Sequence, residues 1–320
     1  MRVAAIDIGT NCVLLLVAEA ERNRGDALRP LLERATVTRL GEGVDRNRRL
    51  LDTACERTLT CLADYAADLR KLGVTQLVAV GTSAMRDAAG GEEFVARAKA
   101  VLGVAPRVID GAEEARLTFA GALSGLPPTG PVTVFDIGGG STEIVLGSRG
   151  AQQRSIAQAV SLNIGSVRLF ERHVTGDPPS VASMALVERD IQDALQSAPE
   201  ASRSLGVGAE ATLVGVAGTV TQLAALELEL ARYDSSRVHG FTLTRSAVER
   251  LATRLASLDL AQRRALPGME PARADVIVVG SAIARAVLQW SGATELVVSD
   301  RGVRWGLAEE LATKLLASAR

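Results

Sequence analysis

The spacing of apolar residues along the chain predicts short buried strands that alternate with helices. Apolar runs of strand length occupy residues 3–8, 13–17, 76–80, 107–109, 132–135, 144–146, 212–216 and 295–298. Apolar residues recur at helical spacing over residues 51–72, 92–101, 184–196, 220–230, 246–258 and 303–319. A further helix begins at Gly111, and the apolar segment 274–290 predicts a buried helix. This alternation is typical of an α/β fold.

A cluster of helix-breaking residues interrupts the chain between its two halves. It consists of Gly125, Pro127, Pro128, Gly130 and Pro131. The chain has 320 residues, whereas a single hydrophobic core rarely grows beyond about 250–300. We therefore expect two domains with a boundary near residue 125.

Both halves open with the same local pattern. A buried strand leads into Asp7-Ile8-Gly9 in the first half and into Asp136-Ile137-Gly138 in the second, and another apolar run follows each turn. The repeated order of strand, Asp-x-Gly turn and strand predicts an internal duplication.

The segment from Asp136 to Glu143 has a composition suited to a phosphate group. Three consecutive glycines allow positive φ and close approach, so that backbone N–H groups can converge on phosphate oxygens. The flanking carboxylates would repel an anion, but Asp136 and Glu143 could hold Mg²⁺ through its waters, and the metal would then neutralise the phosphate charge. The alternative is a tight hairpin whose acids are solvated. The phosphate ligands expected here are Gly138, Gly139, Gly140 and Ser141.

Two further turns follow buried strands and offer hydrogen-bond donors. In the first loop, Gly9, Thr10 and Asn11 are candidate phosphate ligands, and Asp7 should face a cation or an attacking water, because a buried unpaired carboxylate is costly. The second turn contains Gly218 and Thr219. A helix N-terminus there would donate N–H groups to phosphate, but an ordinary strand-to-helix turn explains the sequence equally well.

The overall composition excludes several classes of protein. With 36 basic and 37 acidic residues the net charge is −1, which gives no sign of nucleic-acid binding. A polyanionic substrate must therefore meet a local group of arginines and N–H donors. No apolar run approaches the ~20 residues that span a bilayer, and the N-terminus does not look like a signal peptide, so we expect a cytoplasmic protein without membrane contact.

The residues that usually bind zinc or form disulfides are few. Cys12, Cys55 and Cys61 lack a C-x-x-C spacing, and His173 and His239 stand far apart in sequence. We expect neither a disulfide nor a zinc site.

Taken together, the loops resemble those of the superfamily of acetate and sugar kinases, Hsc70 chaperones and actin. More closely, the chain resembles the exopolyphosphatase and guanosine pentaphosphate phosphatase (Ppx/GppA) family over nearly its whole length. The segments that carry this resemblance are Arg39 to Val44, Gly81 to Ala88, Gly111 to Leu117, Val238 to Gly240, Arg273 to Ile277 and Ser299 to Arg304.

The resemblance implies two ribonuclease-H-like (actin-like ATPase) domains flanking a cleft. Residues 1–125, joined by the C-terminal helix at about 303–320, would form the first domain, and residues 126–302 the second. The chain resembles the short members of the family, which lack the helical HD-like domain of longer relatives. Family members also suggest a homodimer, and the apolar segment 274–290 would suit either a dimer interface or a core.

The resemblance also assigns roles to individual residues. The family's catalytic glutamate falls on Glu114, its phosphate-binding arginine on Arg86, and its metal-associated carboxylates on Asp136 and Glu143. Glu114 would accept a proton from a water aligned with the terminal phosphorus. Adjacent helical residues point about 100° apart, so only one of Glu113 and Glu114 can face the substrate, and the residues alone do not choose between them.

Two positions depart from the family pattern. Cys12 stands where a Ser commonly follows the first loop, which removes a phosphate donor or creates a reactive thiol. Trp305 replaces a Glu that commonly follows Val303-Arg304. His239 is expected to fix its own loop rather than to take part in catalysis.

The function expected from the resemblance is that of an exopolyphosphatase that needs Mg²⁺, or Mn²⁺ in its place, and no organic cofactor. It would release orthophosphate from the end of inorganic polyphosphate. The alternative substrate is guanosine pentaphosphate (pppGpp), which offers the same kind of bond. A kinase of the same superfamily and a non-catalytic nucleotide-binding scaffold are the remaining alternatives.

Overall fold

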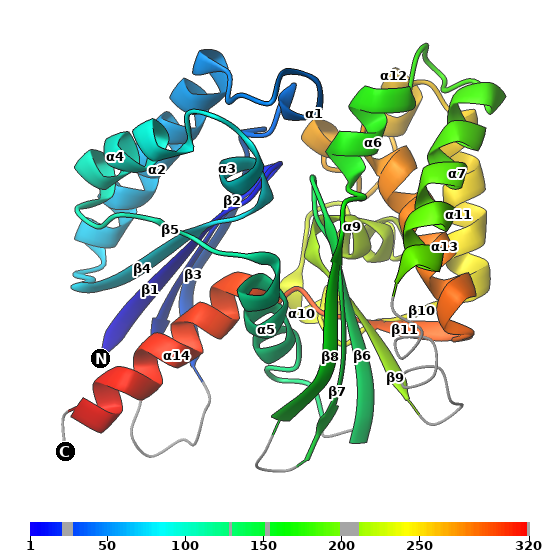
Figure 1. Ribbon diagram of the computed structural model, residues 1–320. Helices are drawn as coiled ribbons and strands as arrows, with labels where there is room; N and C mark the ends of the chain where they lie inside the picture. The colour runs from blue at the N-terminus through cyan, green and yellow to red at the C-terminus, as the bar shows by residue number, and fades with distance from the viewer. Residues whose placement is uncertain (21–27, 128–129, 151–153, 199–210, 319–320) are drawn as a thin grey trace. The chain divides into compact units, whose positions relative to one another are not determined.

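The computed structural model describes residues 1–20, 28–127, 130–150, 154–198 and 211–318. The chain forms two compact units (Figure 1). The first contains Met1–Gly125 and Gly302–Arg320, and the second contains Leu126–Arg301. The last helix of the chain therefore belongs to the first unit.

The first unit is built on a five-stranded sheet of order β3-β2-β1-β4-β5. Its strands are β1 (Arg2–Ile8), β2 (Cys12–Glu19), β3 (Arg29–Val37), β4 (Gln76–Gly81) and β5 (Arg107–Val108). The first three strands form an antiparallel meander. β4 runs parallel to β1, and β5 runs parallel to β4. Three parallel strands consequently end at the same edge of the sheet.

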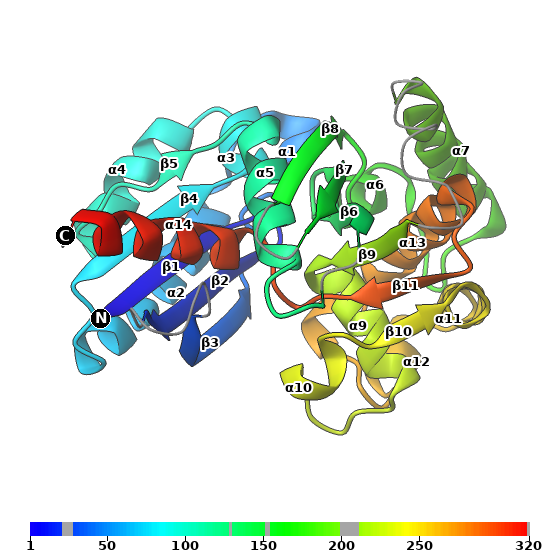
Figure 2. The ribbon, with the colours of Figure 1, turned by 90° about the horizontal axis from the view of Figure 1, so that it is seen from below.

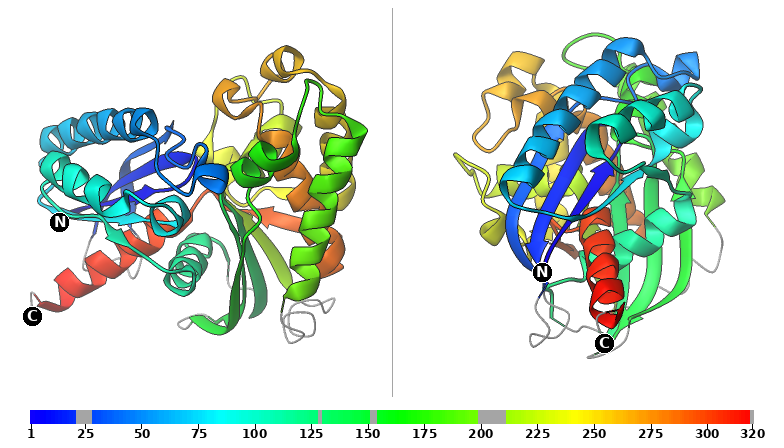
Figure 3. Two further views of the ribbon diagram at one scale, coloured as in Figure 1. Left: turned by 45° about the horizontal axis from the view of Figure 1, so that its top comes forward. Right: turned by 90° about the vertical axis from the view of Figure 1, so that its left-hand side faces the viewer.

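Helices cover both faces of this sheet (Figure 3). The helices on one face are α2 (Asp52–Lys71) and α4 (Gly91–Leu102), and those on the other are α5 (Gly111–Ala122) and α14 (Val303–Ser318). The short helices α1 (Val44–Asn47) and α3 (Ser83–Asp87) lie in the connections. Successive residues of β1 alternate between the two faces, because Ala4 and Ile6 join the core beneath α2, whereas Val3 and Ala5 join the core beneath α14.

The contact between α5 and α14 depends on two glycines. Figure 2 shows α14 lying along β1 with α5 beside it. A Cβ at Gly121 would clash with the Gly302 carbonyl, and one at Gly306 would clash with the Leu117 carbonyl. The two helices thus approach at backbone distance, and this contact fixes the position of α5.

The second unit repeats the order of the first sheet and adds one strand. Its six-stranded sheet has the order β10-β11-β9-β6-β7-β8. The strands are β6 (Gly130–Ile137), β7 (Thr142–Arg149), β8 (Arg154–Leu162), β9 (Thr212–Val216), β10 (Thr242–Thr244) and β11 (Glu295–Val298). Strands β6, β7 and β8 form an antiparallel meander, and β9 and β11 extend the sheet in parallel with β6. The predicted duplication is confirmed.

A single core in the second unit joins the sheet to its helices. The helices are α6 (Ser166–His173), α7 (Val181–Ser197), α9 (Ala217–Glu227), α10 (Ser235–Val238), α11 (Arg245–Ser257), α12 (Leu260–Arg264), the 3₁₀ helix η1 (Pro271–Arg273) and α13 (Ile277–Ser291). The predicted buried helix over 274–290 is α13, and its apolar side chains belong to this core. Their burial accounts for the composition of this segment without a dimer interface.

Most of the expected elements are present, with two kinds of exception. The helix expected over 220–230 begins and ends three residues earlier, as α9. Strands β3, β8 and β10 were not predicted, because all three lie at sheet edges and expose many of their side chains, and α6 was not predicted either. The α/β fold with two ribonuclease-H-like domains is confirmed. No helix in the described part of the chain is long and apolar enough to span a membrane.

Replacing Gly306 by Ala should destabilise the first unit. The added methyl group would force α14 away from α5, and overpacking of this kind costs about 1–3 kcal/mol in free energy of unfolding. Urea unfolding followed by circular dichroism measures the loss, and Lys314→Ala, on the exposed side of the same helix, is the control. Equal stability of the two variants would show that the glycine contact is not needed.

Candidate active site

Three predicted residues of the first unit follow the ends of three adjacent parallel strands. Asp7 lies near the end of β1, α3 with Arg86 follows β4, and α5 with Glu114 follows β5. The carboxyl ends of neighbouring parallel strands are the usual place for ligand-binding groups in open α/β sheets. The sheet therefore brings residues 7, 86 and 114 to one edge.

Glu114 and Arg86 form an ion pair at this edge. Arg86 Nη1 donates to Glu114 Oε2 at 3.2 Å and to the Ile109 carbonyl at 3.0 Å. Arg86 Nε also lies 3.5 Å from Asp87 Oδ1. Glu114 is only 8% exposed, so its charge is held within the protein by a fixed cation rather than by bulk water.

The start of α5 distinguishes the two neighbouring glutamates. Asp110 caps the helix and accepts a hydrogen bond from the Glu113 N–H at 2.8 Å. The Glu113 side chain points to Arg107, whose Nη2 lies 2.8 Å from its carboxylate. This hydrogen bond holds the pKa of the Arg107 guanidinium above its ordinary value. Glu113 is thus engaged in a surface pair, whereas Glu114 is buried beside Arg86.

Backbone hydrogen bonds hold the first Asp-led loop. The Gly9 N–H donates to the Cys12 carbonyl at 2.9 Å and closes the turn. The Asn11 carbonyl accepts from the N–H groups of Thr38 and Arg39, and the Thr10 carbonyl accepts from Gly41. Asn11 is 7% exposed, and its Oδ1 has no hydrogen-bond partner among the described residues. A buried amide oxygen of this kind fits a polar ligand or a hydrated cation.

The second Asp-led loop has the same geometry. The Gly138 N–H donates to the Ser141 carbonyl at 3.0 Å, as Gly9 does to Cys12. Strand register makes Asp7 equivalent to Asp136, because each lies one residue before the last pair of its hairpin. Cys12 therefore occupies the place of Ser141. The residue opposite Asp7 is Leu14, whereas the residue opposite Asp136 is Glu143.

The N-terminus of α6 binds the carbonyl groups of the glycine loop. The Ser166 N–H donates to the Gly138 carbonyl, and the Gly139 carbonyl accepts from the N–H groups of Val167 and Arg168, each at 3.0 Å. Arg168 Nε donates to the Gly140 carbonyl at 2.6 Å. With the carbonyls turned to α6, the N–H groups of Gly139 and Gly140 have no acceptor among the described residues. Buried N–H groups without acceptors are suited to an anion.

The contribution of α6 was missed at the level of sequence. Gly165 leaves room for the loop, since a Cβ there would clash with the Gly139 carbonyl. Arg168 is 8% exposed although it carries a charge. Gly165 stands between a strand and a helix, as the glycines of the other turns follow strands, and could have been noticed for that reason. It lies about 25 residues from the glycine loop, however, so the sequence does not connect the two.

Asp136 and Glu143 have the geometry of a shared cation site. They are direct cross-strand partners, and side chains in such pairs project from the same face with Cβ atoms about 4.5–5.5 Å apart. Glu143 is 1% exposed, and its Oε1 accepts from Ser161 Oγ at 2.7 Å. The described residues contain no group of three or more His, Cys, Asp or Glu side chains placed to hold a metal. Two carboxylates fit Mg²⁺, which usually keeps several waters.

The start of α9 lies beside this pair in the sheet. Val216 pairs with Asp136 and precedes the helix without a side-chain cap. Gly218 and Thr219 belong to the first turn of α9, so their N–H groups are among the donors that a helix leaves unpaired. A Cβ at Gly218 would collide with the Arg273 guanidinium, which shows how closely this arginine approaches the turn.

The structure accounts for Trp305 but assigns it no catalytic role. The side chain is 1% exposed and belongs to the core beneath α14. Its Nε1 donates to Glu33 Oε2 at 3.2 Å, and Arg304 Nη2 donates to the same oxygen at 2.8 Å. Trp305 therefore anchors the start of α14 to β3.

His239 is held by its neighbours, as expected. Its Nδ1 lies 3.1 Å from Asp300 Oδ1 and 3.4 Å from Ser299 Oγ. The Ser299 N–H in turn donates to the Gly215 carbonyl at 2.8 Å. This arrangement fixes the turn after β11 against β9.

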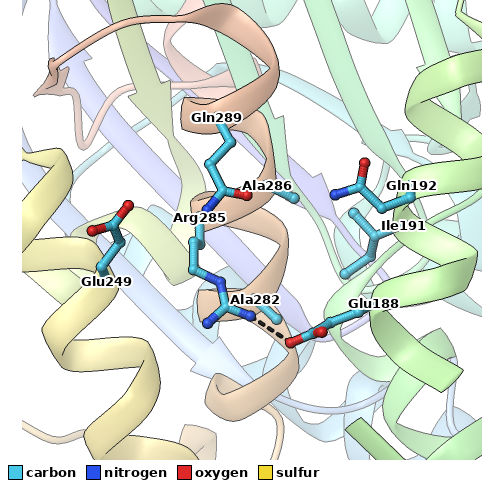
Figure 4. A pocket seen from close by; sticks show the side chains of 8 residues that line it. All are labelled: Glu188, Ile191, Gln192, Glu249, Ala282, Arg285, Ala286 and Gln289. Carbon is cyan, nitrogen blue, oxygen red and sulfur yellow. Dashed lines mark hydrogen bonds and ion pairs between the residues drawn. The ribbon is translucent and has the colours of Figure 1, made fainter. Parts of the chain in front are cut away.

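The predicted residues therefore form two sets, one in each unit. The first unit holds Asp7, Gly9, Thr10, Asn11, Arg86 and Glu114, and the second holds Asp136, Gly138, Gly139, Gly140, Ser141, Glu143, Gly218 and Thr219. A groove of about 520 Å³ between α7, α11 and α13 contains none of them (Figure 4). Ala282 and Ala286 form its floor, and Arg285 pairs with Glu188 at its rim.

Comparison with known proteins gives matches over nearly the full length. Residues 16–315 match the model of the Ppx/GppA phosphatase family. Exopolyphosphatase 2 of Mycobacterium tuberculosis is 38% identical over 97% of this chain and 98% of its own length.

Two solved structures are similar to this chain over nearly its full length. A crystal structure of an exopolyphosphatase-like protein has a TM-score of 0.90 and 34% identity, covering 98% of both chains. The Ppx/GppA protein of Aquifex aeolicus has a TM-score of 0.78 and 32% identity, covering 100% of this chain and 99% of its own. These matches extend over both units, and they show that the chain belongs to the Ppx/GppA phosphatase family.

Proposed function

We propose that this protein hydrolyses the terminal phosphoanhydride bond of inorganic polyphosphate and releases orthophosphate. The observation that carries the proposal is the ion pair between the buried Glu114 and the half-buried Arg86, a candidate base beside a candidate phosphate-binding cation. The full-length similarity to exopolyphosphatase 2 of Mycobacterium tuberculosis supports polyphosphate as the substrate.

Glu114 acts as the general base in this proposal. Its carboxylate accepts a proton from the attacking water, a contribution typically worth about 10²–10⁴ in rate. Arg86 fixes the direction of the carboxylate through Oε2 and is itself fixed by the Ile109 carbonyl. No described residue accepts a hydrogen bond from Arg86 Nη2, which leaves this donor for a phosphate oxygen.

The glycine loop and α9 supply the remaining phosphate contacts. The N–H groups of Gly139 and Gly140 face away from α6 and donate to phosphate oxygens, as do Gly218 and Thr219 at the start of α9. In the first unit, Thr10 and Asn11 add side-chain contacts. Fixed donors of this kind stabilise the charge that spreads over the phosphoryl oxygens in the transition state.

Asp136 and Glu143 are the proposed ligands of Mg²⁺ or Mn²⁺. Bound there, the metal would neutralise charge on the phosphate oxygens. Ser161 holds Glu143 in place, and Asp136 beside it is half-buried. Asp7 has Leu14 opposite it instead of an acid and is proposed as a separate contact to a metal-bound water. No organic cofactor is proposed.

Guanosine pentaphosphate is the second candidate substrate, because its terminal phosphate is joined by the same kind of bond and the family contains both activities. A cytoplasmic location, expected from the sequence, and a homodimer, expected from the resemblance to the family, complete the proposal. Orthophosphate release from long polyphosphate, short polyphosphate and guanosine pentaphosphate, each with Mg²⁺ and with EDTA, tests it. Absence of release from both polyphosphates in Mg²⁺ would refute it.

Glu114→Gln should lower kcat by about 10²–10⁴, because the amide cannot accept the proton. Glu113→Gln, one residue away in the surface pair with Arg107, is the matched control and should keep kcat within about three-fold. Steady-state phosphate release measures both. Full activity of Glu114→Gln would exclude this residue as the base.

Asp136→Asn should raise the Mg²⁺ concentration needed for half-maximal activity by about 10-fold or more, because it removes one anionic ligand. A titration of activity against Mg²⁺ measures the change. The control is Asp193→Asn, an exposed acid on α7. The same half-maximal concentration in both variants would contradict the assignment of Asp136.

Arg168→Lys should lower kcat/KM by about 10- to 100-fold although the charge remains. Lysine cannot reproduce both the Nε contact with Gly140 and the planar guanidinium, and a loop displaced by about 1 Å can cost about 10² in rate. A loss confined to stability, with kcat and KM of the folded variant unchanged, would show that Arg168 does not position the loop. Arg189→Lys on the exposed side of α7 is the control.

A further inference from the structure

Three arginines around α1 form an exposed basic patch. Arg46, Arg48 and Arg49 lie within four positions of one another, and all three side chains are exposed. Their side chains make no hydrogen bond or ion pair with any described residue. Most other exposed cations of the first unit differ in this respect, for example Arg57, whose Nη2 contacts Glu42 Oε2 at 2.5 Å.

The backbone at Arg48 is held in a conformation that favours glycine. Its φ is 52°, in the left-handed region, where a side chain is strained. The turn is fixed by the Arg48 N–H, which donates to the Val44 carbonyl, and by the Arg48 carbonyl, which accepts from Ala89, both at 2.9 Å. The exposed arginine side chain takes no part in these bonds. Glycine would satisfy the turn with less strain, so local structure does not explain the arginine.

The basic patch lies close to the first Asp-led loop. Gly41 donates its N–H to the Thr10 carbonyl at 2.9 Å, and α1 begins three residues later, at Val44. Figure 1 shows α1 at the end of the first unit where β1 leads into this loop. The arginines thus stand at the same edge of the sheet as Asp7, Thr10 and Asn11.

The charges around the patch leave it basic. Its own segment contains one acid, Asp45, against the three arginines. Glu42 before the patch is paired with Arg57, and the next acid is Asp52 at the start of α2. Because the whole chain has a net charge of −1, a polyanion gains attraction here that the overall field does not give.

We propose that Arg46, Arg48 and Arg49 bind the distal phosphates of a polyphosphate chain whose terminal phosphate occupies the hydrolytic site. This inference rests on the proposed function. The loops alone hold a substrate of a few phosphates, whereas a longer chain extends from them over α1. The patch is therefore a determinant of chain-length preference, and its contribution falls as salt screens the charges.

The test compares KM for long polyphosphate with KM for tripolyphosphate in single and combined variants. The measured quantity is the ratio of KM for long polyphosphate to KM for tripolyphosphate. This ratio should rise by about two- to five-fold in each of the single variants Arg48→Gly, Arg46→Ala and Arg49→Ala, and by about 10-fold or more in the triple variant. The difference between wild type and triple variant should shrink at high salt. Arg254→Ala removes an exposed arginine on α11 whose side chain pairs with no described residue, and it should keep the wild-type ratio.

Arg48→Gly also separates binding from folding. Because glycine relieves the left-handed strain, the melting temperature of this variant should equal or exceed that of the wild type, while long polyphosphate binds more weakly. A ratio equal to the wild-type ratio in the triple variant would overturn the inference. If the wild type released phosphate from both substrates, the proposed function would survive that result; if it released none from either, the proposed function itself would fall.

Discussion

Satisfied carbonyl groups determine the direction of both Asp-led loops. In the first unit, residues 38–41 donate to the carbonyls of Thr10 and Asn11, and in the second the start of α6 donates to those of Gly138 and Gly139. A peptide group whose carbonyl is fixed on one side presents its N–H on the other. Fixed N–H groups of this kind suit an anion, because donors that are already oriented need little reorganisation when charge develops.

The duplicated hairpins have diverged in the chemistry that they carry. The hairpin of the second unit has a carboxylate opposite its aspartate and three glycines at its tip, which suits a metal beside a phosphate. The hairpin of the first unit has Leu14 in that position and bulkier residues at its tip. The carboxylate proposed as the base in this unit, Glu114, comes instead from α5. The same strand arrangement therefore carries a pair of carboxylates in the second unit and a single aspartate in the first.

The sequence was sufficient for the fold class, the family and most strands and helices, because buried strands and Asp-x-Gly turns are local patterns. It did not reveal β3, β8 and β10, which lie at sheet edges and expose many of their side chains. It could not decide between Glu113 and Glu114, since that choice depends on Arg107 and Arg86 in three dimensions. Arg168 was also missed, because its contact with Gly140 joins segments that are distant in the chain.

The place of α14 has a consequence for the order in which the protein is made. The first unit lacks part of the cover for one face of its sheet until Gly302 and the residues after it have been synthesised. Domains usually fold as they emerge from the ribosome, the N-terminal one first. Here the N-terminal unit must wait for the last helix, and α5 cannot reach its final contact with Gly306 earlier. The helix that carries Glu114 therefore gains its last packing partner only after Gly306 has been synthesised.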